Sequence, residues 1–167
     1  RDLPWRHSDD PYAVWISEMM LQQTQVAQAR PYFERFMSRF PTVADLGKAS
    51  LDEVLKSWEG LGYYARARNL HSAAQQIVHE HHAKIPDDME TISSLPGIGP
   101  YTSAAVLSIA FGKNYAVVDG NVIRVLSRLF YLTDDPSKAA TKRLITDLAN
   151  RLLKIGRAAD FNQAMME

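Results

Sequence analysis

Apolar residues recur three and four positions apart along most of this chain, and that spacing places them on one face of an α-helix. Asp10 followed by Pro11 is typical of a helix cap with proline in the first turn, ahead of a mainly apolar run. Ser50 and Glu53 have the spacing of a capping box. The pattern predicts at least eight helices and an all-α fold.

Proline and glycine separate the helical stretches from one another. We expect one helix to begin at Pro31 and to end at Pro41, and the helix after Ser50 to stop at Gly60. Apolar positions over residues 70–78 predict a further helix.

Residues 115–118 are the one segment that could pass for a β-strand, and they are too few to found a sheet. We interpret this segment as a linker and as the junction between two domains. The predicted division is a helical barrel domain over residues 3–113 and a second helical domain over residues 114–167, to which residues 1–2 also belong.

A hydrophobic content of 46% over 167 residues is enough to bury a core. No apolar run approaches the roughly 20 residues of a membrane span, and no export signal is visible. We therefore expect a soluble, cytoplasmic protein. The absence of cysteine excludes disulfides and cysteine-ligated metal within these residues. Because the chain begins at Arg1 without methionine and stops at Glu167 inside a helical run, we expect a piece of a longer protein.

The charge balance is even, with 19 Lys and Arg against 19 Asp and Glu. A net charge of zero argues against a protein that binds nucleic acid by bulk electrostatic attraction. Any contact with nucleic acid must therefore depend on local structure.

Residues 95–102, LPGIGPYT, supply a candidate for such a local contact. Gly97 and Gly99 let the backbone turn sharply and approach a ligand closely, and Ile98 between them would bury the turn. The helix that follows would present free N–H groups and its positive dipole end to a phosphate oxygen. Between residues 91 and 118 the only charged residue is Lys113, so the backbone, with a monovalent cation, would hold the anion. The alternative is that both glycines merely form a tight helix–helix turn.

Two carboxylates have contrasting surroundings in the sequence. Glu18 lies in a nearly apolar helical stretch, where desolvation would favour its protonated form and fit it to act as a general acid. Asp119 stands at the N-cap of a helix, where amide donors would keep it ionised and able to face a positive charge. One protonated and one ionised carboxyl group suit glycosidic bond cleavage. The alternatives are a glutamate that is exposed or satisfied by a nearby hydroxyl, and an aspartate that only caps its helix.

Five separated motifs resemble the endonuclease III superfamily of base-excision DNA glycosylases, in the family's order. They are residues 3–6 (LPWR), 15–26 (WISEMMLQQTQV), 60–71 (GLGYYARARNLH), 95–102 (LPGIGPYT) and 117–125 (VVDGNVIRV). The run LQQTQV is similar to the MutY branch. The resemblance implies a helix-hairpin-helix glycosylase fold, with the hairpin at about residues 91–112 and the catalytic cleft between the two helical domains.

What the resemblance implies for activity is removal of adenine mispaired with 8-oxoguanine or guanine, by flipping it out of double-stranded DNA. Glu18 matches the residue that protonates N7 of adenine, and Asp119 the residue that stabilises the sugar cation. Tyr101 matches a position lining the same pocket, where the strand-cleaving members carry a lysine. We therefore expect hydrolysis by water without strand nicking.

Other matched positions imply contacts with DNA. Gln23 would wedge into the base stack with Leu21 and Tyr63 nearby, although a solvated glutamine and two core residues would also explain them. The remaining matched residues lie near the adenine pocket: Trp5, Arg6 and Gln163.

Two further groups of basic residues have simpler explanations. Contact with phosphate and an exposed helix face explain the first group equally well: Arg66, Arg68 and His71. A solvated helix end explains the second group better than a metal site does: His79, His81 and His82.

The resemblance also implies parts that these residues do not contain. Family members carry a preceding helix, four cysteines that bind a [4Fe-4S] cluster after a segment like FNQAMM, and a C-terminal domain. We expect the full-length protein to be a monomeric iron–sulfur enzyme. The rivals are a thymine mismatch glycosylase and a non-catalytic helix-hairpin-helix module that only holds DNA.

Overall fold

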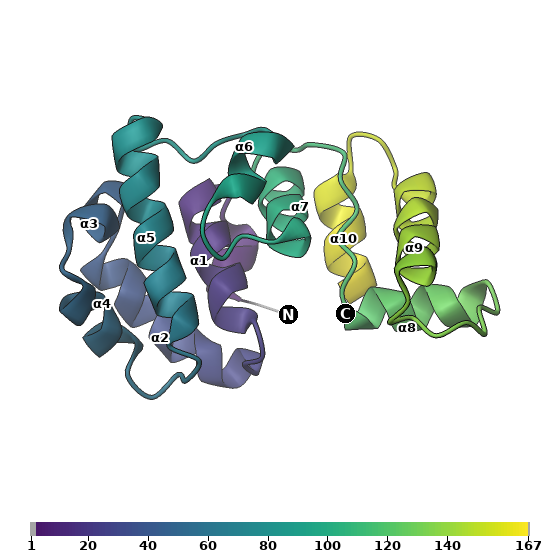
Figure 1. Ribbon diagram of the computed structural model, residues 1–167, viewed down its shortest axis with the longest axis horizontal. Helices are drawn as coiled ribbons and strands as arrows, with labels where there is room; N and C mark the ends of the chain where they lie inside the picture. Colours follow the sequence, from purple (N-terminus) through teal and green to yellow (C-terminus); the bar gives the residue numbers. More distant parts are fainter. Residues whose placement is uncertain (1–2, 167) are drawn as a thin grey trace. The chain divides into compact units, whose positions relative to one another are not determined.

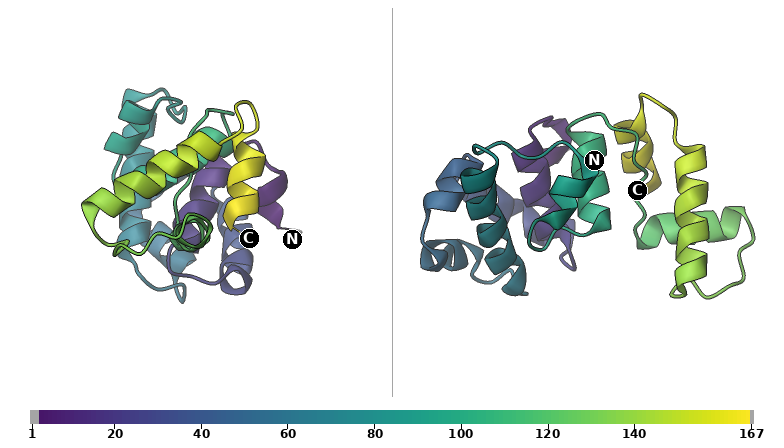
Figure 2. Two further views of the ribbon diagram at one scale, coloured as in Figure 1. Left: turned by 90° about the vertical axis from the view of Figure 1, so that its right-hand side faces the viewer. Right: turned by 45° about the horizontal axis from the view of Figure 1, so that its top comes forward.

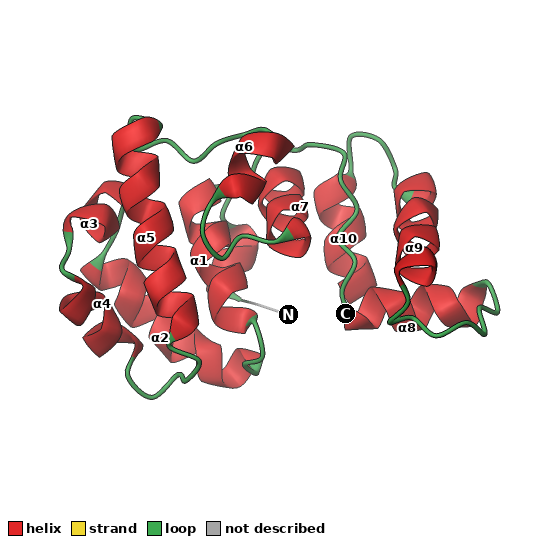
Figure 3. Cartoon of the chain, in the orientation of Figure 1, coloured by secondary structure: helices red, strands yellow, loops and turns green. Residues whose placement is uncertain are grey.

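The computed structural model describes residues 3–166, without the side chains of Arg6 and His7. Over these residues the chain is all-helical and contains no strand, which confirms the predicted fold class (Figures 1 and 3). Two compact units divide at residues 103 and 104, inside one helix. The domain junction that the sequence predicts near residue 114 stays a prediction for the whole protein.

The first unit contains a short 3-10 turn and six complete helices. They are η1 (Pro4–His7), α1 (Pro11–Leu21), α2 (Val26–Arg39), α3 (Val43–Lys48), α4 (Leu51–Trp58), α5 (Ala65–Glu80) and α6 (Met89–Ser94). Helix α7 (Pro100–Ile109) crosses the division. The second unit contains α8 (Gly120–Leu129), α9 (Ala139–Leu152) and α10 (Ala158–Met166).

Helix α1 is the core helix of the first unit. Every residue from Tyr12 to Met20 is buried, and α1 packs against η1, α2 and α5 (Figures 1 and 2). A helix that is buried on all sides needs apolar residues on all sides, and the sequence of α1 meets this requirement. An aromatic cluster extends the core, with the rings of Phe36 and Trp58 edge to face at 5.9 Å.

The predicted helix starts are confirmed where a side chain caps the helix. Asp10 accepts a hydrogen bond from the Tyr12 amide at 3.0 Å, and Ser50 forms a reciprocal capping box with Glu53. Gly60, at φ +92°, follows the end of α4. The sequence analysis missed a second capping box, between Thr42 and Asp45, which starts α3.

The prediction that a helix begins at Pro31 is wrong. Helix α2 begins at Val26, after an extended Gln25 whose carbonyl accepts from the Ala29 amide at 2.9 Å. Proline lacks the amide that would bond the carbonyl of Ala27, but both residues are exposed and water can satisfy that carbonyl. Ala29 is fully buried, so packing holds the first turn in place ahead of the proline.

The second unit has its own core. Helices α9 and α10 pack against α8, around a cluster that includes Val122, Leu126 and Ile145. Residues 112–119 are irregular, which confirms that residues 115–118 do not form a strand. Among the described helices of both units, none is long and apolar enough to cross a membrane.

Candidate functional site

Glu18 lies in the buried helix α1 and is only 7% exposed. Its neighbours on the same helix, Trp15 and Met19, are each 1% exposed. The burial expected from the sequence is therefore confirmed, and an exposed glutamate is excluded. Burial of this kind favours the neutral form of a carboxyl group, which is the form that donates a proton.

Asp119 is the N-cap of α8, as predicted. Its Oδ1 accepts a hydrogen bond from the Val122 amide at 2.8 Å, and its Oδ2 accepts one from the Asn121 side chain at 3.1 Å. Asn121 in turn donates to the carbonyl of Met166. The carboxylate is half-buried and accepts from two donors, so its orientation is fixed.

Asn162 of α10 holds the segment that leads to Asp119. Its amide nitrogen donates to the Tyr115 carbonyl and to Ser108 Oγ, and its Oδ1 accepts from the Val117 amide at 2.9 Å. The side chain is fully buried with its hydrogen-bonding groups paired. Sequence reasoning missed this residue, because Asp160 and Gln163 of the same helix are also polar and Asn162 gives no distinct signal.

The hairpin between α6 and α7 separates the roles of its two glycines. Gly97 has φ +74°, and a Cβ there would stand 2.6 Å from Cβ of Asn69. A Cβ on Gly99 would meet nothing within 4 Å. Ile98 is 5% exposed, and its amide donates to the Leu95 carbonyl at 3.1 Å, so it buries the turn as predicted. The fold requires Gly97, whereas Gly99 leaves open space beside the start of α7.

Two exposed turns carry the predicted wedge residues. Gln23 follows α1 and has φ 55°, and Tyr63 precedes α5 and has φ 49°. Tyr63 is 62% exposed, which excludes a core role, and Leu21 is half-buried. The left-handed region is costly for residues with a Cβ, so surrounding contacts must hold both backbones in place.

The remaining predicted residues lie in several elements. Trp5 is 6% exposed and packs edge to face on Phe33 at 5.2 Å. Tyr101 in α7 and Gln163 in α10 are half-buried. The side chain of Arg6 lies outside the described residues. The DNA contacts of these residues stay predictions.

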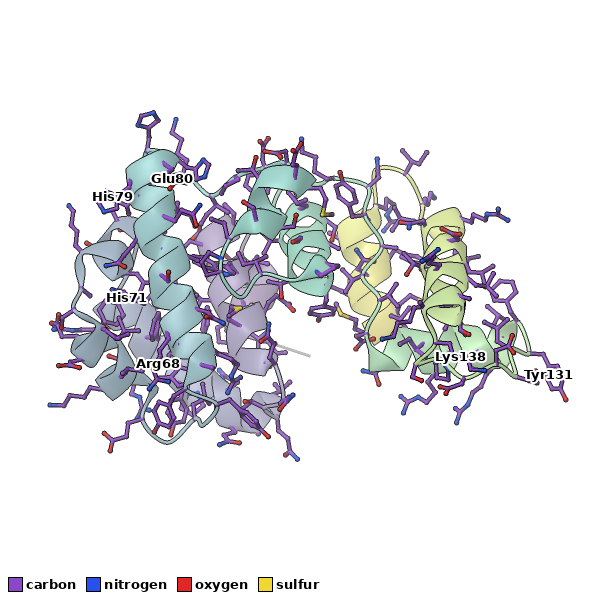
Figure 4. All side chains as sticks on the ribbon, in the orientation of Figure 1. Arg68, His71, His79, Glu80, Tyr131 and Lys138 are labelled. Carbon is purple, nitrogen blue, oxygen red and sulfur yellow. The ribbon has the colours of Figure 1, made fainter. Side chains whose placement is uncertain are left out.

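The sequence leaves phosphate contact and an exposed helix face open for three basic residues of α5, and neither explanation fits two of them. Arg66 is 8% exposed and donates to backbone carbonyls, and His71 is 6% exposed with Nε2 at 2.8 Å from the Ala49 carbonyl. Burial also lowers the pKa of Arg66. Only Arg68 is exposed (Figure 4). Arg66 and His71 face inward because they bond carbonyl groups of the Met20 and Ala49 segments, and sequence spacing within α5 does not reveal those contacts.

Nothing in this part of the chain fits a metal cluster. The sequence has no cysteine, and residues 3–166 hold no group of three His, Cys, Asp or Glu that could bind a metal ion. His79, predicted to be solvated, is exposed at the end of α5 (Figure 4). The residues described here therefore do not supply the ligands of a [4Fe-4S] cluster, and no step of the chemistry below runs through one.

The family model of the HhH-GPD superfamily of base excision DNA repair proteins matches residues 16–151. Adenine DNA glycosylases of Rattus norvegicus and Homo sapiens are each 47% identical over the whole chain, which covers 34% and 32% of their lengths. The enzyme of Buchnera aphidicola subsp. Acyrthosiphon pisum is 40% identical, with 48% of its length covered. The chain thus spans between a third and a half of these relatives.

Solved structures share the fold. A thermostable thymine-DNA glycosylase has a TM-score of 0.90 at 32% identity, covering 99% of this chain and 76% of its own. A trapped endonuclease III–DNA covalent intermediate has a TM-score of 0.82 at 21% identity, covering 96% and 76%. The second likeness concerns the fold alone. Because the family model covers most of the residues and the helices match throughout, the chain belongs to the HhH-GPD superfamily of base excision DNA repair proteins.

Proposed function

We propose that this chain is the catalytic part of a monofunctional adenine DNA glycosylase that removes adenine mispaired with 8-oxoguanine or guanine. One observation carries the proposal: identity with adenine DNA glycosylases extends over the whole chain at 47%. The match with the solved thymine-DNA glycosylase is lower, at 32%. The run LQQTQV at residues 21–26, similar to the MutY branch, also favours adenine.

Glu18 is the proposed general acid. Its burial among apolar side chains supports this role, because a neutral carboxyl group can donate a proton. Donation to N7 of the extruded adenine lets the base accept the electron pair of the N-glycosidic bond as that bond breaks. Water then attacks C1′ of the sugar, and the carboxylate left on Glu18 takes up the proton released.

Asp119 is the proposed partner of the sugar cation. Its hydrogen bonds to the Val122 amide and Asn121 fix a negative charge, which stabilises the positive charge that develops on the sugar. Tyr101 occupies the position at which lyases of the superfamily carry lysine. Without an amine there, no Schiff base can form, so we expect base release without strand cleavage.

DNA is the proposed partner. Because the chain has no net charge, the hairpin and the wedge residues would have to bind it by local contacts. The open space at Gly99 beside the start of α7 supports a phosphate contact, with a monovalent cation at the hairpin. Gln23, Leu21 and Tyr63 would enter the stack beside the mispair. The [4Fe-4S] cluster of the whole protein would be held by residues outside this chain. We propose that the protein acts as a monomer on chromosomal DNA in the cytoplasm.

A gel assay tests the proposal, using both the purified chain and a longer protein that contains it. Duplexes with adenine opposite 8-oxoguanine, adenine opposite guanine and thymine opposite guanine are incubated with excess enzyme, then split into samples with and without alkali. We expect cleavage of the two adenine strands only, and only after alkali. Strand breaks without alkali, or release of thymine but not adenine, would refute it.

Thymine mismatch glycosylase is the second candidate, because the fold likeness to the thymine-DNA glycosylase is close. The thymine duplex in the same assay separates the two enzymes. A non-catalytic binding module would release no base from any duplex and would have no use for a buried Glu18.

A further inference from the structure

Arg66, the second residue of α5, joins two turns that lie about 40 residues apart in the sequence. Nη1 lies 3.1 Å from the Met19 carbonyl and 2.9 Å from that of Met20, at the C-terminal end of α1. It also contacts the Gln22 carbonyl and lies 3.2 Å from Thr24 Oγ1. Nη2 lies 3.1 Å from the Gly62 carbonyl in the second turn.

These contacts compensate for groups that the fold leaves unsatisfied. The last carbonyls of α1 have no intrahelical partner and carry the negative end of the helix dipole. A guanidinium group, with its planar set of donors, can bond several carbonyls at once and remains charged when buried. Because Nη1 and Nη2 already bond protein oxygens inside the fold, Arg66 is not available to phosphate.

We call this set of Arg66 contacts the clamp, and the turns at residues 21–24 and 61–64 the clamped turns. In each clamped turn, a predicted wedge residue directly follows a residue whose carbonyl Arg66 contacts. Gln23 follows Gln22, and Tyr63 follows Gly62, and both are exposed in the left-handed region. The guanidinium also lies 5.4 Å from the ring centre of Tyr63 and 5.4 Å from that of the buried Trp58. One side chain therefore fixes both backbones and packs beneath one of the two wedge side chains.

We infer that Arg66 is a positioning residue for mispair recognition, which sets the spacing between Gln23 and Tyr63 without touching DNA. The inference rests on the proposed function, because only a DNA glycosylase gives these two exposed side chains a base stack to enter. Loss of the clamp should loosen both turns together. Discrimination between adenine opposite 8-oxoguanine and adenine opposite guanine should fall, while excision itself persists.

The clamp is tested without DNA by hydrogen exchange. Arg66→Lys keeps a positive charge but loses the planar fork of donors. We expect faster exchange at residues 21–24 and 61–64 alike, with the rest of α1 and α5 unchanged. Arg30→Met removes an exposed arginine on α2 and serves as the matched control. Unchanged exchange in either turn would overturn the clamp, whatever the enzyme removes.

Recognition is tested by adding DNA. Single-turnover excision by Arg66→Lys should lose about tenfold of its preference for 8-oxoguanine, which corresponds to one charge-assisted hydrogen bond. The same substitution in a Gln23→Ala, Tyr63→Ala background should have no further effect on preference, because its targets are gone. Equal losses in both backgrounds, or no loss in a folded variant, would overturn the inference.

A milder variant covers the case in which Arg66→Lys does not fold. Thr24→Val removes one acceptor of the guanidinium and leaves the arginine in place. It should show a smaller loss of preference in the same direction, and an unchanged preference would count against positioning. Failure of the wild-type chain to release adenine in any assay would refute the proposed function, while the hydrogen-exchange result would still decide the clamp.

Discussion

Helices α1 and α8 each carry one of the two proposed catalytic carboxylates, and they hold them by different means. Every residue of α1 from Tyr12 to Met20 is buried, so Glu18 lies within the core of the first unit. In α8 only Val122 and Leu126 are buried, and Leu129 is 65% exposed. Asp119 is fixed by hydrogen bonds at the helix start instead.

The difference bears on the chemistry that each group can perform. Burial removes water from around Glu18, whereas the Val122 amide and the Asn121 side chain orient the Asp119 carboxylate. The difference also determines which part of the fold a substitution will disturb. A change at Glu18 alters a group in the core, and a change at Asp119 alters a helix cap, so isosteric amides should separate chemistry from structure at both positions.

Glu18→Gln should have the largest effect on activity. The amide keeps the shape of the side chain but cannot donate the proton, and excision should fall by a factor on the order of 10²–10⁴. DNA affinity should stay near that of the wild type. Single-turnover excision and a binding titration on the same duplex measure both quantities.

A matched control for that experiment is Glu59→Gln. Glu59 is exposed at the end of α4, and its substitution should change neither quantity. If Glu18→Gln excised adenine at the wild-type rate, the general-acid role would be wrong, and the burial of Glu18 would need another explanation.

Asp119→Asn and Asp119→Ala should separate charge from capping. Asparagine still accepts from the Val122 amide but no longer accepts from Asn121, so stability should fall by about 1 kcal/mol or less. Alanine abolishes the cap, at a cost of about 0.5–2 kcal/mol. Both variants lose the negative charge, and excision should fall by a factor on the order of 10²–10³ in each.

Denaturant unfolding and single-turnover excision measure these two effects independently. An Asp119→Asn variant with full activity would leave the residue with its capping role alone. That outcome would refute the proposal of two catalytic carboxyl groups, because only Glu18 would then take part in the reaction.

Substitution of the two hairpin glycines should affect two different properties. Gly97→Ala should lower stability, and Gly99→Ala should lower affinity for DNA. Gly97→Ala forces a Cβ onto φ +74° and against Asn69, and we expect a loss of about 2–4 kcal/mol of stability. Gly99→Ala should change stability by about 0.5 kcal/mol at most. If its Cβ blocks a phosphate contact, affinity should fall about tenfold, as for one lost charge-assisted hydrogen bond. Unfolding curves and binding titrations measure the two; full affinity in Gly99→Ala would remove the hairpin from the interface.

Local features were predictable from the sequence because neighbouring residues determine them. The caps at Asp10, Ser50 and Asp119 follow from one residue and the backbone amide two or three positions ahead. The burial of Glu18 follows in the same way from its apolar neighbours on one helix.

Contacts between distant segments were not predictable. Arg66 and Arg68 look alike in the sequence, yet one is buried on carbonyls more than 40 residues away and the other is exposed. Asn162 bonds a segment about 45 residues earlier. The left-handed backbone at Gln23 likewise depends on tertiary contacts, because its residue type does not favour that conformation.

Two exposed carboxylates, Glu53 in the capping box of α4 and Asp135 in the loop before α9, should give the smallest effect, which appears only as a dependence on pH. Hydrogen bonds from Ser50 lower the pKa of Glu53 from its usual 4.5, and hydrogen bonds from Ser137 lower that of Asp135 from 3.8. A lowered pKa in the folded state means that the carboxylate stabilises the fold above the unfolded value, and that this contribution is lost as the pH falls through the folded value. The loss should therefore begin below 4.5 for Glu53 and below 3.8 for Asp135.

Thermal melting at a series of pH values measures this contribution. The difference in melting temperature between the wild type and Glu53→Gln should be present at about pH 7 and should shrink progressively as the pH falls below 4.5. Asp135→Asn should converge with the wild type over a lower range. Because both carboxylates are exposed, salt should shrink the differences. A difference that persists at low pH would mean that the side chain acts through packing, as the neighbours of Glu18 do, and not through its charge.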